Sequence, residues 1–224
     1  MPRIVFPPRP GGPSAVPATR RGSISFIALV LWGCGVAAGF VWALVYENTP
    51  ARTDAAAEQW PLESECPLAA DRPTLVMFVH PRCPCSRASL DELAVLMTRR
   101  GDRLAAHVLF LRPRSAPDVW AETDLWRSAA RIPGVAVRVD AGGVEQRRFG
   151  ARVSGEVFLY APSGGLSFHG GITAGRGHAG DNPGRSAIES VLLQHEPPAV
   201  ATAVFGCELS SRTDSDDIAT RPDR

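Results

Sequence analysis

The stretch Phe78-Val-His-Pro-Arg-Cys83-Pro-Cys85-Ser-Arg-Ala-Ser-Leu-Asp-Glu-Leu93 decides the fold, because a strand pattern turns into a helix pattern within it. The apolar, β-prone run 75–79 leads into the stretch, and apolar residues then recur at mostly helical spacing. Pro84 suits the first helical position, where no backbone N–H is needed. The sequence therefore predicts a strand over 74–80, a helix over 86–100 and two cysteines at their junction.

The two cysteines at this junction point to redox chemistry. A thiol at the start of a helix faces unpaired backbone N–H groups and the positive end of the helix dipole, which lower its pKa. Thiol-disulfide exchange needs such a thiolate to attack and a second thiol to resolve the mixed disulfide. Cys83 is the candidate for the first role and Cys85 for the second. Arg82, Arg87 and a protonated His80 would add positive charge around the sulfur.

Four cysteines lie outside the apolar N-terminal segment: Cys66, Cys83, Cys85 and Cys207. An even number in an oxidising compartment permits three full pairings, so static bridges are the alternative to a redox pair. Cys207 is either a third redox partner or a clamp to Cys66. We favour the structural use, which makes Cys66 and Cys207 candidates for a structural disulfide.

Length, composition and charge limit the possible classes of protein. The chain has 224 residues with 45% hydrophobic character, enough for one domain of ordinary size plus appendages. Its net charge of +1 gives no sign of a nucleic-acid partner. Residues 1–22 hold several arginines, no acid and many Pro and Gly residues, so they predict a disordered tail.

Residues 23–46 contain no charged side chain and are long enough to cross a bilayer as one helix. Arginines precede the segment and acids follow it, so the positive-inside rule puts the N-terminus in the cytoplasm and the rest outside. The alternative is a signal peptide, cleaved near Asp54-Ala-Ala-Ala57, but signal cores are shorter, about 7 to 15 residues. Gly35 and Gly39 form a small-xxx-small pair that would allow dimerisation.

The remaining sequence divides into a linker over 47–65, a domain over 66–197 and a C-terminal tail over 198–224 that carries Cys207. Within the domain, Asn182 is placed to cap a helix that has Pro183 in its first turn. Strands alternating with helices predict an α/β domain, a mixed sheet flanked by helices. The further elements expected are strands at 104–111, 135–139, 156–160 and 166–169 and helices at 118–131, 143–149 and 183–195.

The order of these elements, the cysteine motif after the first strand, and Phe149-Gly-Ala-Arg-Val-Ser-Gly155-Glu-Val-Phe-Leu-Tyr160 resemble the thioredoxin-like superfamily. The resemblance covers roughly residues 66–195 and implies a thiol-disulfide oxidoreductase acting on protein thiols or disulfides. More narrowly, the cysteine motif, the segment 170–182 and Val204-Phe-Gly-Cys207 resemble the RedB group of membrane-anchored bacterial proteins. That likeness implies a single-pass protein of the bacterial cytoplasmic membrane with a periplasmic domain.

Two positions depart from the thioredoxin-like pattern. Ser86 stands where the family has its second cysteine, so the dithiol is Cys-x-Cys with Cys85 one position early. Gly155 stands where the family has a cis-proline beside the attacking sulfur. We therefore expect this chain to handle its substrate differently.

Two other functions remain open. Soft thiolates suit Cu(I), so Cys83 and Cys85 with His80, or with His169 or His178, could bind or deliver copper, whereas exchange needs no cofactor. A binding module that only keeps the fold is the other alternative. The glycine-rich loop within 164–184 is long enough to cover the thiols, and His178 is its candidate site residue.

Overall fold

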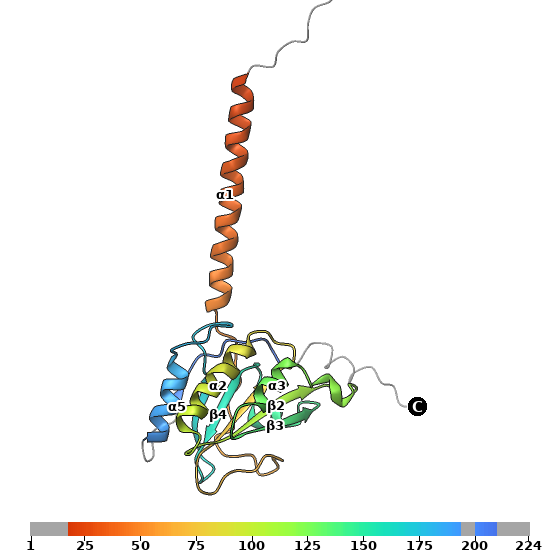
Figure 1. Ribbon diagram of the computed structural model, residues 1–224, viewed down its shortest axis with the longest axis vertical. Helices are drawn as coiled ribbons and strands as arrows, with labels where there is room; N and C mark the ends of the chain where they lie inside the picture. Colours follow the sequence, from red (N-terminus) through yellow and green to blue (C-terminus); the bar gives the residue numbers. More distant parts are fainter. Residues whose placement is uncertain (1–17, 194–199, 210–224) are drawn as a thin grey trace, which may run out of the picture. The chain divides into compact units, whose positions relative to one another are not determined.

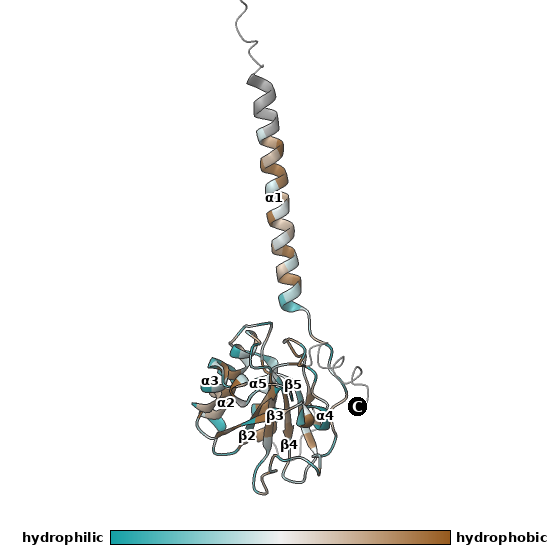
Figure 2. Cartoon of the chain, turned by 90° about the vertical axis from the view of Figure 1, so that its right-hand side faces the viewer, coloured by the Kyte–Doolittle hydropathy of each residue, from teal (hydrophilic) through white to brown (hydrophobic). Residues whose placement is uncertain are grey.

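The computed structural model describes residues 18–193 and 200–209, and it divides into two units after Val45. The predictions for residues 1–17, 194–199 and 210–224 lie outside the described residues, including the predicted ends of the last helix and of the domain. Helix α1 (Ala18–Asn48) contains the stretch Ser25–Asn48, the only described helix long and apolar enough to cross a membrane. Figure 2 shows this apolar character along the helix. A signal sequence passes the same test, so anchoring stays a prediction.

The C-terminal unit is built on one six-stranded mixed sheet in the order β3-β2-β1-β4-β5-β6 (Figure 1). Strand β1 pairs in parallel with β2 and antiparallel with β4, so the chain reverses direction at the centre of the sheet. The two-residue strand β6 was not predicted, and it pairs in parallel with β5. The strands are β1 (Thr74–Val79), β2 (Ala105–Arg112), β3 (Val135–Ala141), β4 (Glu156–Tyr160), β5 (Leu166–Gly171) and β6 (Val200–Ala201).

The helices follow the predicted order with one difference. The helix expected over 118–131 is a 3-10 turn followed by a separate helix, because Thr123 between them is extended, with φ −83° and ψ −176°. Asn182 does cap the last helix, since its Oδ1 accepts the Arg185 N–H at 2.8 Å. The helical elements are α2 (Ser86–Arg100), η1 (Asp118–Trp120), α3 (Asp124–Ala130), α4 (Val144–Phe149) and α5 (Pro183–Leu193).

Each face of the sheet carries its own apolar cluster, because successive strand residues point to opposite faces. In β1, Leu75, Met77 and Val79 pack with α2, α3 and α5 on one face. Val76 and Phe78 pack with Phe149 of α4 and with Trp60 on the other face. A mixed sheet with helices on both faces confirms the predicted α/β class.

The segment predicted as a linker, 47–65, is part of the C-terminal unit. Its backbone bonds to distant segments, for example Trp60 N–H to the Gly164 carbonyl at 2.8 Å and Ala57 N–H to Phe149 at 3.2 Å. The Trp60 ring stacks edge-on against Phe149 and Tyr160 at 5.1 and 5.2 Å between centroids. Polar composition concealed this packing, since backbone hydrogen bonds make most of the attachment.

The predicted C-terminal tail, 198–224, is also packed where it is described, at 200–209. Thr202 N–H donates to the His169 carbonyl at 3.1 Å, and Leu209 N–H donates to the Arg152 carbonyl at 2.8 Å. Ala51 N–H donates to the Val204 carbonyl at 2.8 Å. This segment therefore crosses the end of the sheet that carries the junction of β1 and α2, and it brings Cys207 there.

Candidate active site

Cys83 and Cys85 lie between the end of β1 and the start of α2, as the sequence predicts. The turn is closed by two backbone hydrogen bonds, Cys83 N–H to the His80 carbonyl at 3.0 Å and Ser86 N–H to the Cys83 carbonyl at 3.2 Å. Cys85 occupies the N-cap position of α2 in a helical conformation, with φ −64° and ψ −29°. The junction therefore fixes both thiols at the amino end of α2.

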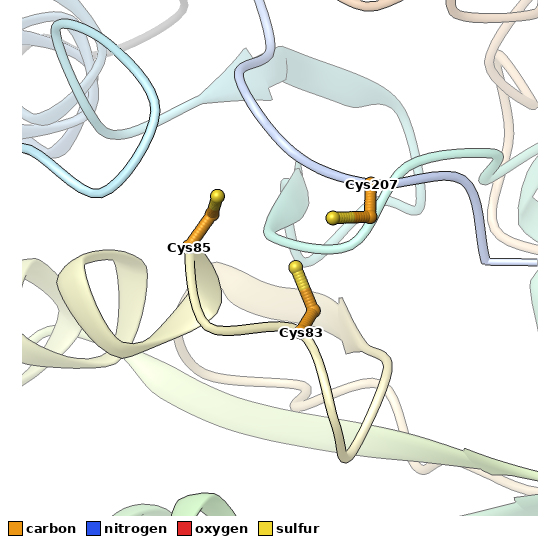
Figure 3. Close-up of side chains that lie close together, drawn as sticks. All are labelled: Cys83, Cys85 and Cys207. Atoms are coloured by element: carbon orange, nitrogen blue, oxygen red, sulfur yellow. The ribbon is translucent and has the colours of Figure 1, made fainter. Parts of the chain in front are cut away.

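A third sulfur completes the site. The Sγ atoms of Cys83, Cys85 and Cys207 all lie within 4.8 Å of one another, and all three thiols are free (Figure 3). Cys207 comes from the C-terminal segment, 124 positions after Cys83 in the sequence. The close spacing allows exchange among the three sulfur atoms.

The segment that carries Cys207 is fixed by pairing with the loop before β4. Ser154 N–H donates to the Cys207 carbonyl at 2.8 Å, and Val153 forms an antiparallel bridge with Glu208. A Cβ on Gly206 would lie 2.0 Å from the Ser154 carbonyl oxygen, so only glycine permits this approach. The position of Cys207 therefore depends on backbone contacts on both sides of it.

The pKa of Cys83 is lowered far below its ordinary value of 9.0, although its side chain is only 2% exposed. The main cause is a hydrogen bond from the Cys207 thiol, followed by one from the Ser86 hydroxyl. The backbone N–H groups of Cys207 and Ser86 also bond the sulfur. Burial acts the other way, but donors that stabilise the charged form outweigh it.

A chain of buried hydroxyl groups leads to Cys83. His80 N–H donates to Ser154 Oγ at 2.7 Å, and Ser154 Oγ lies 2.6 Å from Ser86 Oγ. Because Ser154 accepts from His80, its own proton is available to Ser86, and the Ser86 proton is then directed to the thiolate. The Ser86 hydroxyl thus supplies a hydrogen-bond donor at the position where the family that the sequence resembles has a second cysteine.

Cys85 and Cys207 keep their protons beside this thiolate. Burial and the negative charge of Cys83 raise the pKa of Cys85. The bond to Cys83, burial and the nearby charge raise the pKa of Cys207. Arg176 opposes both shifts, and its guanidinium donates to the Gly206 carbonyl and stacks over Tyr46, 4.8 Å from the ring centroid. The site therefore holds one thiolate and two thiols.

The cations predicted around Cys83 are engaged elsewhere. Arg82 lies over the Trp120 ring at 4.8 Å, and His80 packs edge-on against the same ring at 5.7 Å. His80 Nδ1 accepts the Arg82 N–H at 3.2 Å. Arg87 pairs with Asp124. Hydrogen bonds, and not these three side chains, are thus the main cause of the low pKa of Cys83.

Gly155 lies beside α2 and has a conformation that proline cannot adopt. Its φ is 90°, whereas the proline ring fixes φ near −65°, and its N–H donates to the Phe78 carbonyl at 2.7 Å. A Cβ there would lie 2.6 Å from Ser89 Oγ. The departure from the cis-proline pattern is therefore a structural requirement of this loop.

His178 and Cys66 lie outside the cysteine cluster. His178 is exposed, and its Nε2 lies 3.4 Å from Glu47 Oε2. Cys66 is a free thiol in the core cluster around Trp60, so the expected bridge between Cys66 and Cys207 is not formed. The reason is that the C-terminal segment directs Cys207 to Cys83.

A buried ion pair that the sequence analysis missed holds the glycine-rich loop to α2. Glu92 is 2% exposed and pairs with Arg185, which is 5% exposed and also bonds Asp181 at 2.9 Å. Glu92 also accepts the Gly180 N–H at 2.5 Å and an Asn182 amide N–H at 3.0 Å. Separating Glu92 from Arg185 would leave an uncompensated buried charge, which costs free energy. The pair therefore holds the loop 172–182 beside the site. The only sign of this ion pair in the sequence is Glu92, an acidic residue on the apolar side of the helix predicted over 86–100.

No protein-family model and no curated protein matches this chain. A hypothetical protein from Sinorhizobium meliloti is similar in structure, with 23% identity, TM-score 0.50, and 72% of this chain and 93% of that one covered. An uncharacterized conserved protein from Geobacillus kaustophilus has 12% identity, TM-score 0.52, and coverage of 74% and 93%. A secreted disulfide oxidoreductase from Mycobacterium tuberculosis has 16% identity, TM-score 0.41, and coverage of 56% and 83%.

Proposed function

We propose that this chain, which has the thioredoxin-like fold, is a thiol-disulfide oxidoreductase whose attacking group is the Cys83 thiolate. The observation that carries the proposal is a stabilised thiolate with two protonated thiols within 4.8 Å. A thiolate attacks a disulfide, and a second thiol in reach then releases the product. The same donors that lower the pKa of Cys83 stabilise the reduced protein, which favours oxidation of partner thiols.

The proposal places the protein on the outer side of the bacterial cytoplasmic membrane, anchored by residues 23–46. The apolar stretch of α1 and the arginines before it support this orientation. We expect the protein to stay in the membranes after an alkaline wash. We also expect protease to digest its C-terminal domain only from the outer side. Release by the wash, or digestion only from the cytoplasmic side, would contradict the anchored orientation.

Exchange is tested on the full-length, detergent-solubilised protein with oxidised glutathione and a model dithiol. The Cys83→Ser variant is expected to lose exchange by at least about 100-fold, because it lacks the stabilised thiolate that attacks the substrate. The matched control is Cys66→Ala, which removes an equally buried thiol outside the cluster. Equal activity of Cys83→Ser and wild type would refute the proposal.

A second candidate function is Cu(I) binding by the three sulfur atoms of the cluster, since three cysteine ligands at this spacing, with Cys85 and Cys207 losing their protons on binding, suit a soft ion. His80 bonds elsewhere through Nδ1, so Cys207 replaces it in the predicted ligand set. Stoichiometric Cu(I) retained against a chelator, and lost in Cys83→Ser, would support this function. Loss of copper to the chelator from the wild-type protein would exclude it.

A further inference from the structure

We propose that Cys207, and not Cys85, is the thiol that resolves the mixed disulfide on Cys83. The inference rests on the proposed exchange function and names the second thiol of the same site. In this arrangement the C-terminal segment 200–209 supplies half of the redox pair. Cys85 remains a thiol through the whole reaction.

The direction of the side chains supports Cys207. The thiol of Cys207 and its backbone N–H both bond the Cys83 sulfur. Figure 3 shows the Cys83 and Cys207 side chains converging at their sulfur atoms. The Cys85 thiol also bonds Cys83, but it is not among the main causes of the low pKa of Cys83, whereas Cys207 is the first of them. The attacking sulfur must approach the Cys83 sulfur from the side opposite to the sulfur that leaves, and the Cys207 sulfur already lies within 4.8 Å of it.

The backbone opposes closure between Cys83 and Cys85. The carbonyls of Cys83 and Pro84 accept N–H groups of the next turn, from Ser86 at 3.2 Å and Arg87 at 3.3 Å. Pro84 between the cysteines also has a fixed φ. A disulfide needs Cβ atoms about 3.5 to 4.5 Å apart and facing one another, so this pair would have to unwind the start of α2. Cys207 carries no such restriction, because it comes from a separate segment.

The C-terminal segment holds Cys207 in place without a covalent bond. Its attachments on both sides of the cysteine are backbone hydrogen bonds with Arg152 and Ser154 at 2.8 Å and the guanidinium of Arg176 on the Gly206 carbonyl. Formation of a disulfide brings the two sulfur atoms from within 4.8 Å to about 2.05 Å, and rotation of the Cys207 side chain moves its sulfur without breaking these backbone bonds.

In the proposed reaction, the Cys83–Cys207 dithiol reduces a substrate disulfide in two exchange steps. The Cys83 thiolate attacks one sulfur of a substrate disulfide; that S–S bond breaks, and the first substrate sulfur leaves as a thiolate that takes a proton from solvent. Cys207 then loses its proton to the solvent, and its sulfur attacks Cys83. The mixed disulfide breaks and the second substrate thiolate leaves. The protein dithiol is oxidised by two electrons, the substrate disulfide is reduced by two, and oxidation of a substrate dithiol follows the same steps in reverse.

The test uses full-length protein, reduced and then mixed with oxidised glutathione, acid-quenched at intervals and mapped by mass spectrometry. Wild type and Cys85→Ser are expected to form the disulfide between Cys83 and Cys207. Cys207→Ser is expected to accumulate glutathione on Cys83 and to release it at least about 10-fold more slowly, because the proposed resolving thiol is lost.

A Cys83–Cys85 disulfide in the wild type would overturn the inference, as would accumulation of the glutathione adduct in Cys85→Ser but not in Cys207→Ser. Mapping of the wild type decides the question even if a variant fails to fold. Absence of both the adduct and any Cys83 disulfide in the wild type would instead refute the proposed function. A normal adduct on Cys83 that resolves through Cys85 would leave the function intact and remove only Cys207 from it.

Discussion

Cys83 and Cys66 are equally buried, at 2% and 3% exposure, yet their thiols have opposite acidities. Burial and the charge of Glu145 raise the pKa of Cys66 to about 11, and the nearby Ser64 hydroxyl opposes this only weakly because it donates to Glu145 at 2.5 Å. Around Cys83, two side chains and two backbone N–H groups lower the pKa instead. Burial therefore disfavours the charged thiolate, and directed hydrogen-bond donors stabilise it more than nearby cations do.

The largest expected difference between Cys83 and Cys66 is in their rates of alkylation. With iodoacetamide near neutral pH, the reduced native protein should react at Cys83 on the order of 1000-fold faster than at Cys66, because only the thiolate reacts. Peptide mapping after a timed quench measures both rates in one sample. Comparable rates in the folded protein would remove the distinction between the two environments.

The pH dependence of stability should differ between the same two thiols. The folded pKa of Cys83 lies below its unfolded value, so between the two values the unfolded chain holds the proton and stability rises with pH. This contribution is fully present above the unfolded pKa, near 9.0, and is lost as pH falls through the lower folded pKa. The reverse holds for Cys66, whose contribution decreases above pH 9.0 toward about 11.

Denaturant unfolding of the reduced protein at several pH values measures this difference. The free energy of unfolding of wild type relative to Cys83→Ser should rise with pH by at most about 1.4 kcal/mol per unit between the two pKa values of Cys83. Cys66→Ala provides the control, since it should leave that slope in place. A parallel pH profile for wild type and Cys83→Ser would show that the donors do not act on an ionised sulfur.

Removal of one donor should have the smallest effect. Ser86→Ala is expected to raise the pKa of Cys83 by about 1 to 2 units, since a hydrogen bond to a charged group contributes about 1.5 to 3 kcal/mol. Thiolate absorbance in the ultraviolet, titrated in a Cys66→Ala background, gives the value. Ser64→Ala is the matched control, because Ser64 lies beside Cys66 and its removal should leave the pKa of Cys83 unchanged.

The sequence predicts the elements well where local pattern and turn chemistry agree. The apolar run 75–79, Pro84 and the Asn182 cap give β1, the start of α2 and the start of α5 within one residue of the observed bounds. It also predicts Cys83 as the reactive sulfur, which follows from its place at the start of a helix. These features depend on neighbours in the chain.

The donors of Cys83 could not be predicted in the same way. Cys207 reaches Cys83, and Ser154 reaches Ser86, only through tertiary contacts. The residues around Cys207 have no regular pattern that indicates pairing with the loop before β4. From the sequence, the low pKa is attributed to the start of the helix, with added positive charge from Arg82, Arg87 and His80 because they are adjacent in sequence. In the structure two of these side chains lie at Trp120 and the third pairs with Asp124.

The attachment of Cys207 through the C-terminal segment affects the order in which the protein matures. Cys83 is synthesised 124 positions before Cys207, so during translation and export its nearest companion is Cys85. Until residues 200–209 dock, Cys83 is without the main hydrogen-bond donor that lowers its pKa. Docking of residues 200–209 thus converts Cys83 from an ordinary thiol of the nascent chain into a reactive one.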